Sequence, residues 1–345
     1  MSNKSVMVVG GGIAGLTAAW ELARQNIRVE LVEKRSFLGG HSIGFTCKAV
    51  DECRQCGACS VELMLANVIN QPLINIHLSC EVKSINRGKT IQAVLRKSSA
   101  KGIDDHGAEK ELKVDAVVLA TGFSPFDPEL KPGLGYGRKK NVITSMELEN
   151  LLRKNSGLTR PSDGKAPERV AFIQCVGSRD QHLGNLWCSQ VCCTYAMGMA
   201  SVIKHKKEDT DISIFYMDIQ NSAREFPIFH EKVKNEVKFK RAIPVDIYQI
   251  DNDRLSLGYM SEKTGLPMHE KFDLVVLSIG MMPGTDTVAI SEKFAVDINE
   301  FGFLADSGRG VFVAGTAKGP GSIFDTIADS EKAALEAMQY LGVIK

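Results

Sequence analysis

The chain has 345 residues, of which 44% are hydrophobic and 24% charged, a balance typical of a two-domain globular protein and unlike that of a disordered or fibrous chain. Lys and Arg number 42 against 41 Asp and Glu, and this net charge of +1, without a long run of one sign, gives no indication of a nucleic-acid partner. The longest apolar stretches, such as residues 6–16, are too short to span a bilayer, and no secretory cleavage pattern follows the first residues. We therefore expect a cytoplasmic protein without a membrane span.

A strand, a glycine turn, a helix and a second strand are predicted at the start of the chain. They are read at residues 5–9, 10–15, 16–25 and 27–33. In the dinucleotide-binding fingerprint, Gly10 would make the tight turn, Gly12 would let the backbone approach a pyrophosphate, and Gly15 would let helix and strand pack closely. The helix N-terminus would donate its amides to the phosphates, and Glu33 would accept hydrogen bonds from a ribose. The pattern predicts a dinucleotide site.

An internal repeat predicts a second unit of the same type. Residues 115–125 are echoed by residues 273–283, and two nucleotide-binding-like units would each end in this way. Counting back from the second copy, we expect parallel strands at 169–173 and 212–217, with Asp218 following as a structural acid or a mimic of a ribose-binding one. The expected crossings between the units are the loops at 124–141 and 154–168, which are rich in Pro, Gly and charge.

Eight of the nine cysteines fall into two groups of four. In a long chain without a secretory signal, clustered thiols indicate metal or redox sites rather than disulfides. The second group consists of Cys175, Cys188, Cys192 and Cys193. It stands where a second unit would carry its nicotinamide-binding glycines, and neither GxGxxG nor GxGxxA follows residue 173. The ordinary entry route for a hydride is therefore expected to be absent.

Four thiolates in this second group can hold a cubane iron-sulfur cluster, while zinc and free redox thiols are the alternatives. Adjacent cysteines such as Cys192 and Cys193 are unusual at tetrahedral zinc sites, which favours the iron-sulfur interpretation. The helix predicted over residues 189–204 would begin at this cluster, so its first-turn amides could hydrogen-bond the sulfides and tune the reduction potential.

Further matches along the chain carry a resemblance to a known superfamily. They are Glu33-Lys34, Leu38-Gly39-Gly40-His41, Glu81-Val82, Ala120-Thr121-Gly122 and Val311-Phe312-Val313-Ala314-Gly315-Thr316. In this order they resemble the thioredoxin reductase and disulfide reductase flavoproteins over nearly the whole chain. The resemblance implies an α/β fold with two Rossmann-like domains. A thioredoxin reductase-like FAD domain, residues 1–150 and 285–345, would contain an inserted second domain, residues 151–284, that carries the second cysteine group.

The resemblance also assigns roles around FAD. Gly40 would lie near the pyrophosphate, Val82 near the adenine, and Thr121 and Gly122 at a chain crossover. Gly315 and Thr316 would lie at the ribitol phosphate. The residues expected to bind the cofactor are Gly10, Gly12, Ile13, Ala14, Gly15, Glu33, Lys34, Gly40, His41, Val82, Ala120, Thr121, Gly122, Gly315, Thr316, Ser322 and Ile323.

A second, sharper resemblance is to the A-type subunit of heterodisulfide reductase. It is carried by residues 173–180, 188–196, 215–219, 314–323 and 325–328. In that family the cysteines matching Cys175, Cys188, Cys192 and Cys193 ligate a [4Fe-4S] cluster beside the flavin. The segment matching Ser322 and Ile323 opens a helix whose N-terminus faces the isoalloxazine ring, where its dipole would favour negative charge.

The chain also departs from the family pattern. The repeated cysteine runs of ferredoxin domains are absent, so the sequence most resembles the short A-type subunit found with the heterodisulfide-reductase-like complex of sulfur oxidisers. Many family members carry a lysine able to reach the flavin N5 at the position of Gly198. The loss of this cation favours a subunit that does not bifurcate electrons.

The first cysteine group admits three interpretations. It consists of Cys47, Cys53, Cys56 and Cys59. The spacing suits a second cluster, yet no proline follows Cys59 and a helix is predicted to continue from it. The other two interpretations are unmetallated thiols near the flavin or an interface, and ligands shared with a partner subunit. Cys80, at a predicted strand end, is expected to be a buried small hydrophobe.

The sequence thus predicts a flavin-dependent oxidoreductase in which FAD stores electrons and a [4Fe-4S] cluster relays them. The resemblance implies partners like heterodisulfide reductase subunits B and C, a disulfide or sulfane-sulfur substrate on those partners, and a homodimer. One alternative is a self-sufficient NAD(P)H-dependent disulfide reductase with Cys53 and Cys56 as its redox pair. The other is a non-catalytic scaffold with a vestigial nucleotide fold.

Overall fold

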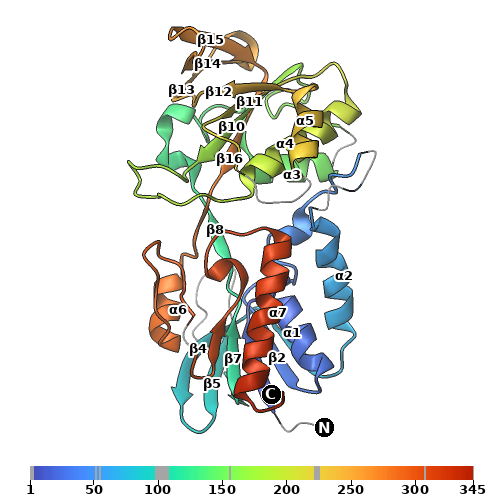
Figure 1. The fold of residues 1–345 in the computed structure, drawn as a ribbon, viewed down its shortest axis with the longest axis vertical. Helices are drawn as coiled ribbons and strands as arrows, with labels where there is room; N and C mark the ends of the chain where they lie inside the picture. The colour runs from blue at the N-terminus through green and yellow to red at the C-terminus, as the bar shows by residue number, and fades with distance from the viewer. Residues whose placement is uncertain are drawn as a thin grey trace. The chain divides into compact units, whose positions relative to one another are not determined.

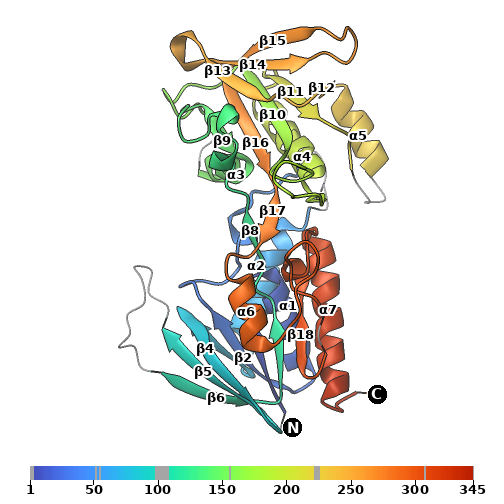
Figure 2. The same cartoon turned by 90° about the vertical axis from the view of Figure 1, so that its left-hand side faces the viewer.

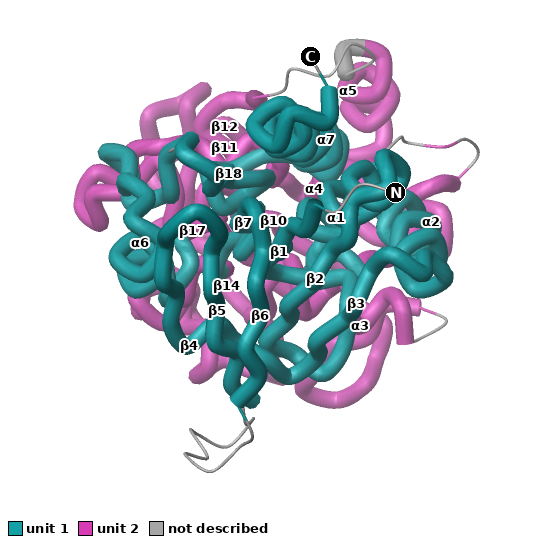
Figure 3. The backbone as a smooth tube through the Cα atoms, turned by 90° about the horizontal axis from the view of Figure 1, so that it is seen from below, with its two compact units in different colours: residues 1–43, 57–124, 283–345 teal, residues 44–56, 125–282 magenta. Residues whose placement is uncertain are grey.

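The computed structural model describes residues 4–50, 53, 56–97, 109–154, 157–220, 226–306 and 308–344. The chain forms two compact units. Unit 1 comprises residues 1–43, 57–124 and 283–345, and unit 2 comprises residues 44–56 and 125–282 (Figure 3). Each unit is described by itself below.

Unit 1 is built on a five-stranded parallel sheet with the strand order β18-β7-β1-β2-β3 (Figure 1). Its strands are β1 (Ser5–Val9), β2 (Arg28–Glu33), β3 (Ile74–Leu78), β7 (Ala116–Leu119) and β18 (Val311–Val313). The central strands β1 and β7 and the strand β18 are nearly continuous apolar runs because both faces of the sheet are covered, whereas β2 and β3 also carry polar residues.

Helices cover one face of this sheet and a second, antiparallel sheet covers the other (Figure 2). The helices are α1 (Ile13–Arg24), α2 (Ala58–Ile69) and α7 (Ile323–Tyr340). The opposite layer contains β4 (Cys80–Arg87), β5 (Ile91–Lys97), β6 (Lys110–Val114) and α6 (Thr287–Phe294). The parallel sheet therefore lies between two hydrophobic cores.

Unit 2 repeats this plan with a five-stranded parallel sheet in the order β12-β11-β10-β16-β9. The strands are β9 (Val142–Thr144), β10 (Arg169–Val176), β11 (Asp211–Tyr216), β12 (Lys238–Arg241) and β16 (Leu274–Ile279). Helices α3 (Ser145–Lys154), α4 (Cys192–Lys206) and α5 (Phe226–Lys234) pack on one side. The antiparallel strands β13 (Asp246–Gln249), β14 (Leu255–Met260) and β15 (Pro267–Phe272) pack on the other.

The internal repeat seen in the sequence corresponds to equivalent strands of the two units. Its copies contain β7 and β16, and they end in β8 (Phe123–Pro125) and β17 (Met281–Pro283), which pair as a two-stranded sheet where the chain passes from one unit to the other. The remaining short elements are the 3-10 turns Ser42–Gly44, Pro128–Leu130, Pro132–Leu134, Asp251–Asp253 and Gly315–Ala317. None of the described helices is long and apolar enough to cross a bilayer.

The limits of the units differ from the expected domain limits at 150 and 284. Residues 125–150 belong to unit 2, because β9 pairs with β16 in the register Val142 to Val275. Residues 44–56 also belong to unit 2, where an ion pair from Lys48 to Glu149 ties them to α3. Both differences arise from contacts between residues far apart in the sequence, which a reading of composition along the chain does not reveal.

Candidate functional site

The glycine turn after β1 has the close packing that the fingerprint predicts. A Cβ added to Gly15 would lie 1.8 Å from the carbonyl oxygen of Gly10, and one added to Gly10 would lie 2.2 Å from the carbonyl oxygen of Ala120. Gly10 also has a φ of +106°, which L side chains rarely adopt. The fold itself therefore requires glycine at both positions.

Gly12 differs from Gly10 and Gly15 because the fold leaves space beside it. It is the N-cap of α1 with an ordinary φ of −75°, and no side chain caps the helix, so the first-turn amides are available to a ligand. A Cβ on Gly12 would have only the Cα of Gly40 within 4 Å, at 3.8 Å. The Gly39 amide donates to the Gly11 carbonyl at 2.7 Å, so the loop after β2 borders the same space. A pyrophosphate fits this arrangement.

Glu33 lies at the end of β2 and is turned toward the glycine turn. Its carboxylate is buried and accepts hydrogen bonds from the Gly11 amide at 2.6 Å and from the Arg35 amide at 2.7 Å. His41 is mostly buried, and burial together with the positive charge of Arg35 lowers its pKa. Lys34 instead forms an exposed ion pair with Asp286 at 2.8 Å.

The later FAD-binding candidates also gather in unit 1. Gly315, with a φ of +65°, packs on helix α1, where a Cβ would lie 2.7 Å from the Cβ of Ala14. Its amide donates to Asp329 at 2.7 Å, a contact that sequence reasoning missed because Asp329 lies within α7, away from the motif. Gly122 is near Thr316, whose Oγ1 would be 3.9 Å from an added Cβ.

The carboxyl ends of β1, β2, β7 and β18 carry most of these residues, and a ligand of an open α/β sheet binds at this edge. Ser322 is the N-cap of α7, and its hydroxyl accepts from the Asp325 amide at 3.1 Å while the Asp325 carboxylate accepts from the Ser322 amide at 3.0 Å. Ile323 is the first residue of α7. Val82 is buried in β4, with Lys293 donating to its carbonyl oxygen.

The second cysteine group is formed by a bulged strand, a loop and a helix start in unit 2. Cys175 lies in β10 with a φ of +57°, and the pairing of β10 with β16 shifts between Ile173 and Val176. Such a bulge redirects a side chain, and left-handed backbone at a non-glycine residue is found preferentially at functional sites. Cys192 and Cys193 are the first two residues of α4, whose N-terminus lacks a side-chain cap.

The four thiols interact with one another. A hydrogen bond with Cys192 lowers the pKa of Cys175. A second hydrogen bond with Cys192 lowers the pKa of Cys193 to about 7. The pKa of Cys192 itself is raised by its hydrogen bonds with Cys175 and Cys193 and by burial. Burial, with the charges of Cys175 and Cys193, raises the pKa of Cys188. The fold thus brings Cys175, Cys192 and Cys193 into hydrogen-bonding contact, while Cys188 interacts with this group only through charge.

The four cysteines supply the type of ligand that a cubane cluster uses. Within the part of the chain that the structure describes, no three His, Cys, Asp or Glu side chains are placed to hold one metal ion. A [4Fe-4S] cluster instead takes four thiolates, each on a different iron. The Ser178 hydroxyl and the Gln174 carbonyl oxygen, on either side of Cys175, are buried without a hydrogen-bond partner. The uncapped start of α4 supplies further polar groups.

The turn after β10 is closed to a second dinucleotide. Gly177 has a φ of +86°, and a Cβ on it would lie 2.0 Å from the ring of Phe126. Phe126 is only 3% exposed, so its ring fills the space over the turn that a pyrophosphate would need. Sequence reasoning missed Phe126 because it lies in an expected crossing loop. This packing agrees with the predicted absence of the usual nicotinamide site.

A buried ion pair joins residues 44–50 to the rest of unit 2. Lys48 and Glu149 have side chains only 5% and 2% exposed, and their charged atoms are 2.5 Å apart. The Glu149 carboxylate also accepts from the Thr46 amide at 2.8 Å, and the Lys48 ammonium lies 4.9 Å from the centre of the Tyr195 ring. A Cβ on Gly198 would come within 3.3 Å of the Lys48 side chain. Gly198 therefore makes room for a lysine that comes from another segment.

The first cysteine group is more exposed than the second. Cys47, Cys53 and Cys59 are exposed and Cys56 is half-buried, and Cys59 lies in the first turn of α2. Residues 51, 52, 54 and 55 of this segment lie outside the described residues. Cys80 is half-buried at the start of β4 rather than fully buried as expected, because it lies at the margin of the core.

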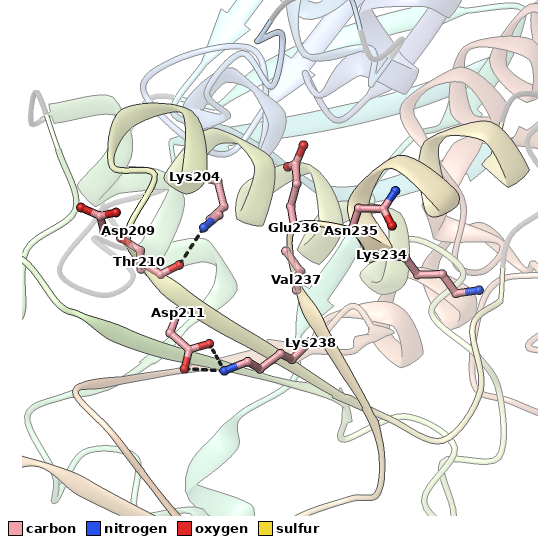
Figure 4. A pocket seen from close by; sticks show the side chains of 9 residues that line it. All are labelled: Lys204, Asp209, Thr210, Asp211, Lys234, Asn235, Glu236, Val237 and Lys238. Atoms are coloured by element: carbon pink, nitrogen blue, oxygen red, sulfur yellow. Dashed lines mark hydrogen bonds and ion pairs between the residues drawn. The ribbon is translucent and has the colours of Figure 1, made fainter.

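A separate hollow of about 380 Å³ lies at the other end of the unit 2 sheet (Figure 4). It is lined by Lys204, Asp209, Thr210, Asp211, Lys234, Asn235, Glu236, Val237 and Lys238. Lys238 is paired with Asp211 at 2.8 Å, and Lys204 donates to the carbonyl oxygen of Thr210 at 3.3 Å. Asp211 and Lys238 begin their strands, whereas ligands of such sheets bind at the carboxyl ends. The hollow is therefore not the functional site.

Comparisons with known proteins agree with the site in unit 1. The family model described as pyridine nucleotide-disulphide oxidoreductase matches residues 4–173. Thioredoxin reductase of T. acidophilum has a TM-score of 0.64 and 18% identity, covering 99% of this chain and 100% of that one. Thioredoxin reductase of Lactococcus lactis has a TM-score of 0.65 and 17% identity with the same coverage. The predicted fold class, the two-domain α/β fold of thioredoxin reductases, is confirmed.

Sequence relatives define the family more narrowly. The A-type subunit of the H(2):CoB-CoM heterodisulfide,ferredoxin reductase of Methanothermobacter marburgensis is 30% identical over 422 residues, covering 97% of this chain and 63% of the relative. An A-type iron-sulfur subunit of the CoB-CoM heterodisulfide reductase of Methanopyrus kandleri is 31% identical over 418 residues, covering 96% of this chain and 63% of the relative. The chain thus spans less than two thirds of these relatives. Over nearly its whole length it is similar to the A-type subunits of heterodisulfide reductases.

Proposed function

We propose that this chain is the FAD and iron-sulfur electron-transfer subunit of a heterodisulfide-reductase-like complex. The observation that carries the proposal is the contact of Cys175 in β10 with Cys192 and Cys193 at the start of α4, with Cys188 as the fourth thiol of the group. They stand where a nucleotide-binding turn would be, and Phe126 closes that turn. When bound, FAD supplies two-electron storage and a [4Fe-4S] cluster supplies single-electron transfer.

The chain's own residues would hold the two groups in different ways. The Gly10–Gly15 turn and the uncapped amides of α1 would bind the FAD pyrophosphate, and Glu33 would bind the ribose. The four thiolates would ligate the cluster, and the uncapped amides of α4 would hydrogen-bond its sulfur atoms. Burial of Cys175, Cys192 and Cys193 would limit access of water to the cluster.

The names of the relatives support a place in a larger assembly. They designate A-type subunits of heterodisulfide reductases, so we propose partners like subunits B and C of such complexes, with disulfide or sulfane-sulfur chemistry on the partners. We further propose a homodimer that works in the cytoplasm in sulfur metabolism, as in the complexes of sulfur oxidisers. Electrons would pass singly from this subunit to its partners.

We also propose that this subunit does not bifurcate electrons. The family lysine is replaced by Gly198, and the lysine that packs there, Lys48, has its charge balanced by Glu149 at 2.5 Å. Lys48 therefore does not replace the positive charge of the family lysine beside Gly198, because Glu149 neutralises it. A reductive titration followed by optical and spin-resonance spectroscopy should show stepwise one-electron uptake by the flavin. A single two-electron step would count against the proposal.

The decisive test of the proposed function is the iron-to-flavin ratio of anaerobically purified protein, recorded with its visible spectrum. About four irons per FAD are expected for one cubane cluster. Changing Cys192 and Cys193 to Ser should remove the iron and keep the flavin, because FAD binds in unit 1. Cys80→Ser is the matched control, since Cys80 lies in β4 and should leave the iron content unchanged.

Other results would change the interpretation in distinct ways. About eight irons per FAD would assign a second cluster to the first cysteine group. Flavin without iron would contradict the electron-relay function, and rapid bleaching of the flavin by NADH or NADPH would favour the self-sufficient disulfide reductase. A colourless protein would favour the scaffold.

A further inference from the structure

We propose that Asp329, in helix α7, is a positioning residue for FAD, because it holds the turn Gly315–Ala317 beside the N-terminus of α1, where the pyrophosphate is proposed to bind. The inference rests on the proposed function, since it concerns the FAD that this function places in unit 1. It assigns a role to a carboxylate that is not among the residues expected to touch the cofactor.

The turn Gly315–Ala317 lies between two helices of unit 1. It follows β18 and precedes α7 (Figure 2). Gly315 has a φ of +65°, and a Cβ added to it would lie 2.7 Å from the Cβ of Ala14 in α1 and 2.9 Å from the Cγ2 of Thr326 in α7. Ala14 is the second residue of α1, so the turn borders the helix N-terminus that no side chain caps. The position of the turn therefore shapes the proposed FAD site.

Asp329 binds this turn through both of its carboxylate oxygens. Oδ2 accepts a hydrogen bond from the Gly315 amide at 2.7 Å, and Oδ1 lies 2.6 Å from Nζ of Lys318, the residue after the turn. The Lys318 amide donates to the carbonyl oxygen of Gly315 at 3.0 Å, which closes the turn. Nζ of Lys318 also lies 3.2 Å from Asp306. Charge-assisted hydrogen bonds are short and strong, so the carboxylate fixes the turn relative to α7.

The exposure of this ion pair separates the positioning of the turn from the folding of unit 1. The side chains of Lys318 and Asp329 are 24% and 26% exposed, and an ion pair that water still reaches contributes little to stability. The contacts of Gly315 with Ala14 and Thr326 are made by carbon atoms and do not need the carboxylate. Loss of Asp329 should therefore leave unit 1 folded with a more mobile turn, which FAD would have to order when it binds.

The test measures FAD affinity and the mobility of the turn in variants of the whole chain. Asp329→Ala should bind FAD about tenfold more weakly than wild type, because the turn loses a charge-assisted hydrogen bond and must be ordered on binding. Amide hydrogen exchange of the apoprotein should become faster within residues 314–318 and stay unchanged elsewhere. Asp329→Asn keeps a carbonyl oxygen for the Gly315 amide, so it should lie between wild type and Asp329→Ala in both measurements.

Glu336→Ala is the matched control, because Glu336 pairs with Lys332 at 3.5 Å about two turns further along the same helix. It should change neither FAD affinity nor exchange in the turn. If Asp329→Ala binds FAD as tightly as Glu336→Ala does, the inference is overturned while the proposed function stands. An Asp329→Ala chain that does not fold would also overturn it, because the carboxylate would then serve the fold itself.

The two substitutions of Asp329 give a further criterion. Equal losses of affinity in Asp329→Asn and Asp329→Ala would overturn the inference, since the acceptor for the Gly315 amide is what distinguishes them. Wild-type protein that binds no FAD would overturn the proposed function and this inference together.

Discussion

Gly12→Ala is expected to yield a folded protein that has lost most of its FAD. The new Cβ meets only the Cα of Gly40, at 3.8 Å, and φ is −75°, so the polypeptide accepts alanine without strain. The methyl group would instead occupy the space through which a pyrophosphate approaches the α1 amides. We expect FAD to bind at least about tenfold more weakly, which corresponds to about 1.4 kcal/mol. Flavin content and FAD titration of the apoprotein measure this.

Two further glycines provide controls for Gly12→Ala. Gly88, between β4 and β5, has the carbonyl oxygen of Thr90 at the same 3.8 Å from an added Cβ, so Gly88→Ala should keep both fold and flavin. Gly15→Ala would place its Cβ 1.8 Å from the Gly10 oxygen and should lower the melting temperature of the apoprotein itself. Stoichiometric FAD in the Gly12→Ala variant would contradict the prediction. So would a Gly12→Ala apoprotein that is less stable than the Gly88→Ala apoprotein, because the space beside Gly12 would then serve the fold and not the pyrophosphate.

Lys48→Met is expected to reduce the stability of unit 2 by about 3–5 kcal/mol, because it leaves the Glu149 carboxylate buried without its partner. Replacing both residues, as Lys48→Met with Glu149→Leu, should recover much of this loss, since an apolar pair removes the uncompensated charge. Some of the loss should persist, because the Thr46 amide donates to Glu149 at 2.8 Å and would lose its acceptor. The measurement is denaturant unfolding followed by a probe in unit 2.

A solvent-exposed ion pair provides the control for Lys48→Met. Lys83 and Glu109 form an ion pair whose charged atoms are also 2.5 Å apart, but their side chains are 45% and 48% exposed. Lys83→Met should therefore cost no more than about 1 kcal/mol. If Lys48→Met is no more damaging than Lys83→Met, the buried pair does not hold residues 44–50 to unit 2 as inferred here.

The local elements were predictable because short-range rules govern them. The first strand was expected at residues 5–9 and is β1, and the glycine turn is followed by α1. The strand expected at 169–173 is β10, which continues to Val176 through a bulge. That extension was not predictable, because the bulge depends on pairing with β16, about a hundred residues further along the chain.

The glycine turn and the second cysteine group could be located from the sequence alone. Glycines that permit a tight turn, and cysteines at a recognisable spacing, are needed by chemistry that acts over a few residues. Gly10 and Gly15 have the predicted close packing, and Cys175, Cys192 and Cys193 of the second group hydrogen-bond to one another. For the glycine turn and the cysteine group, the residue type itself indicates what is needed: glycine permits the tight turn, and cysteine supplies a sulfur ligand.

The residues around those two places could be identified only from the folded structure. Lys48 and Glu149 are 101 positions apart, and Arg179 and Asp218 are 39 apart. Asp218 stood out in the sequence by its place after a predicted strand, but no local pattern identified its partner Arg179 or the pair of Lys48 and Glu149. Their pairing depends on which elements the fold places together, because a charge becomes costly or useful only when burial removes water from it. The same holds for Phe126, an ordinary loop residue until its ring covers Gly177.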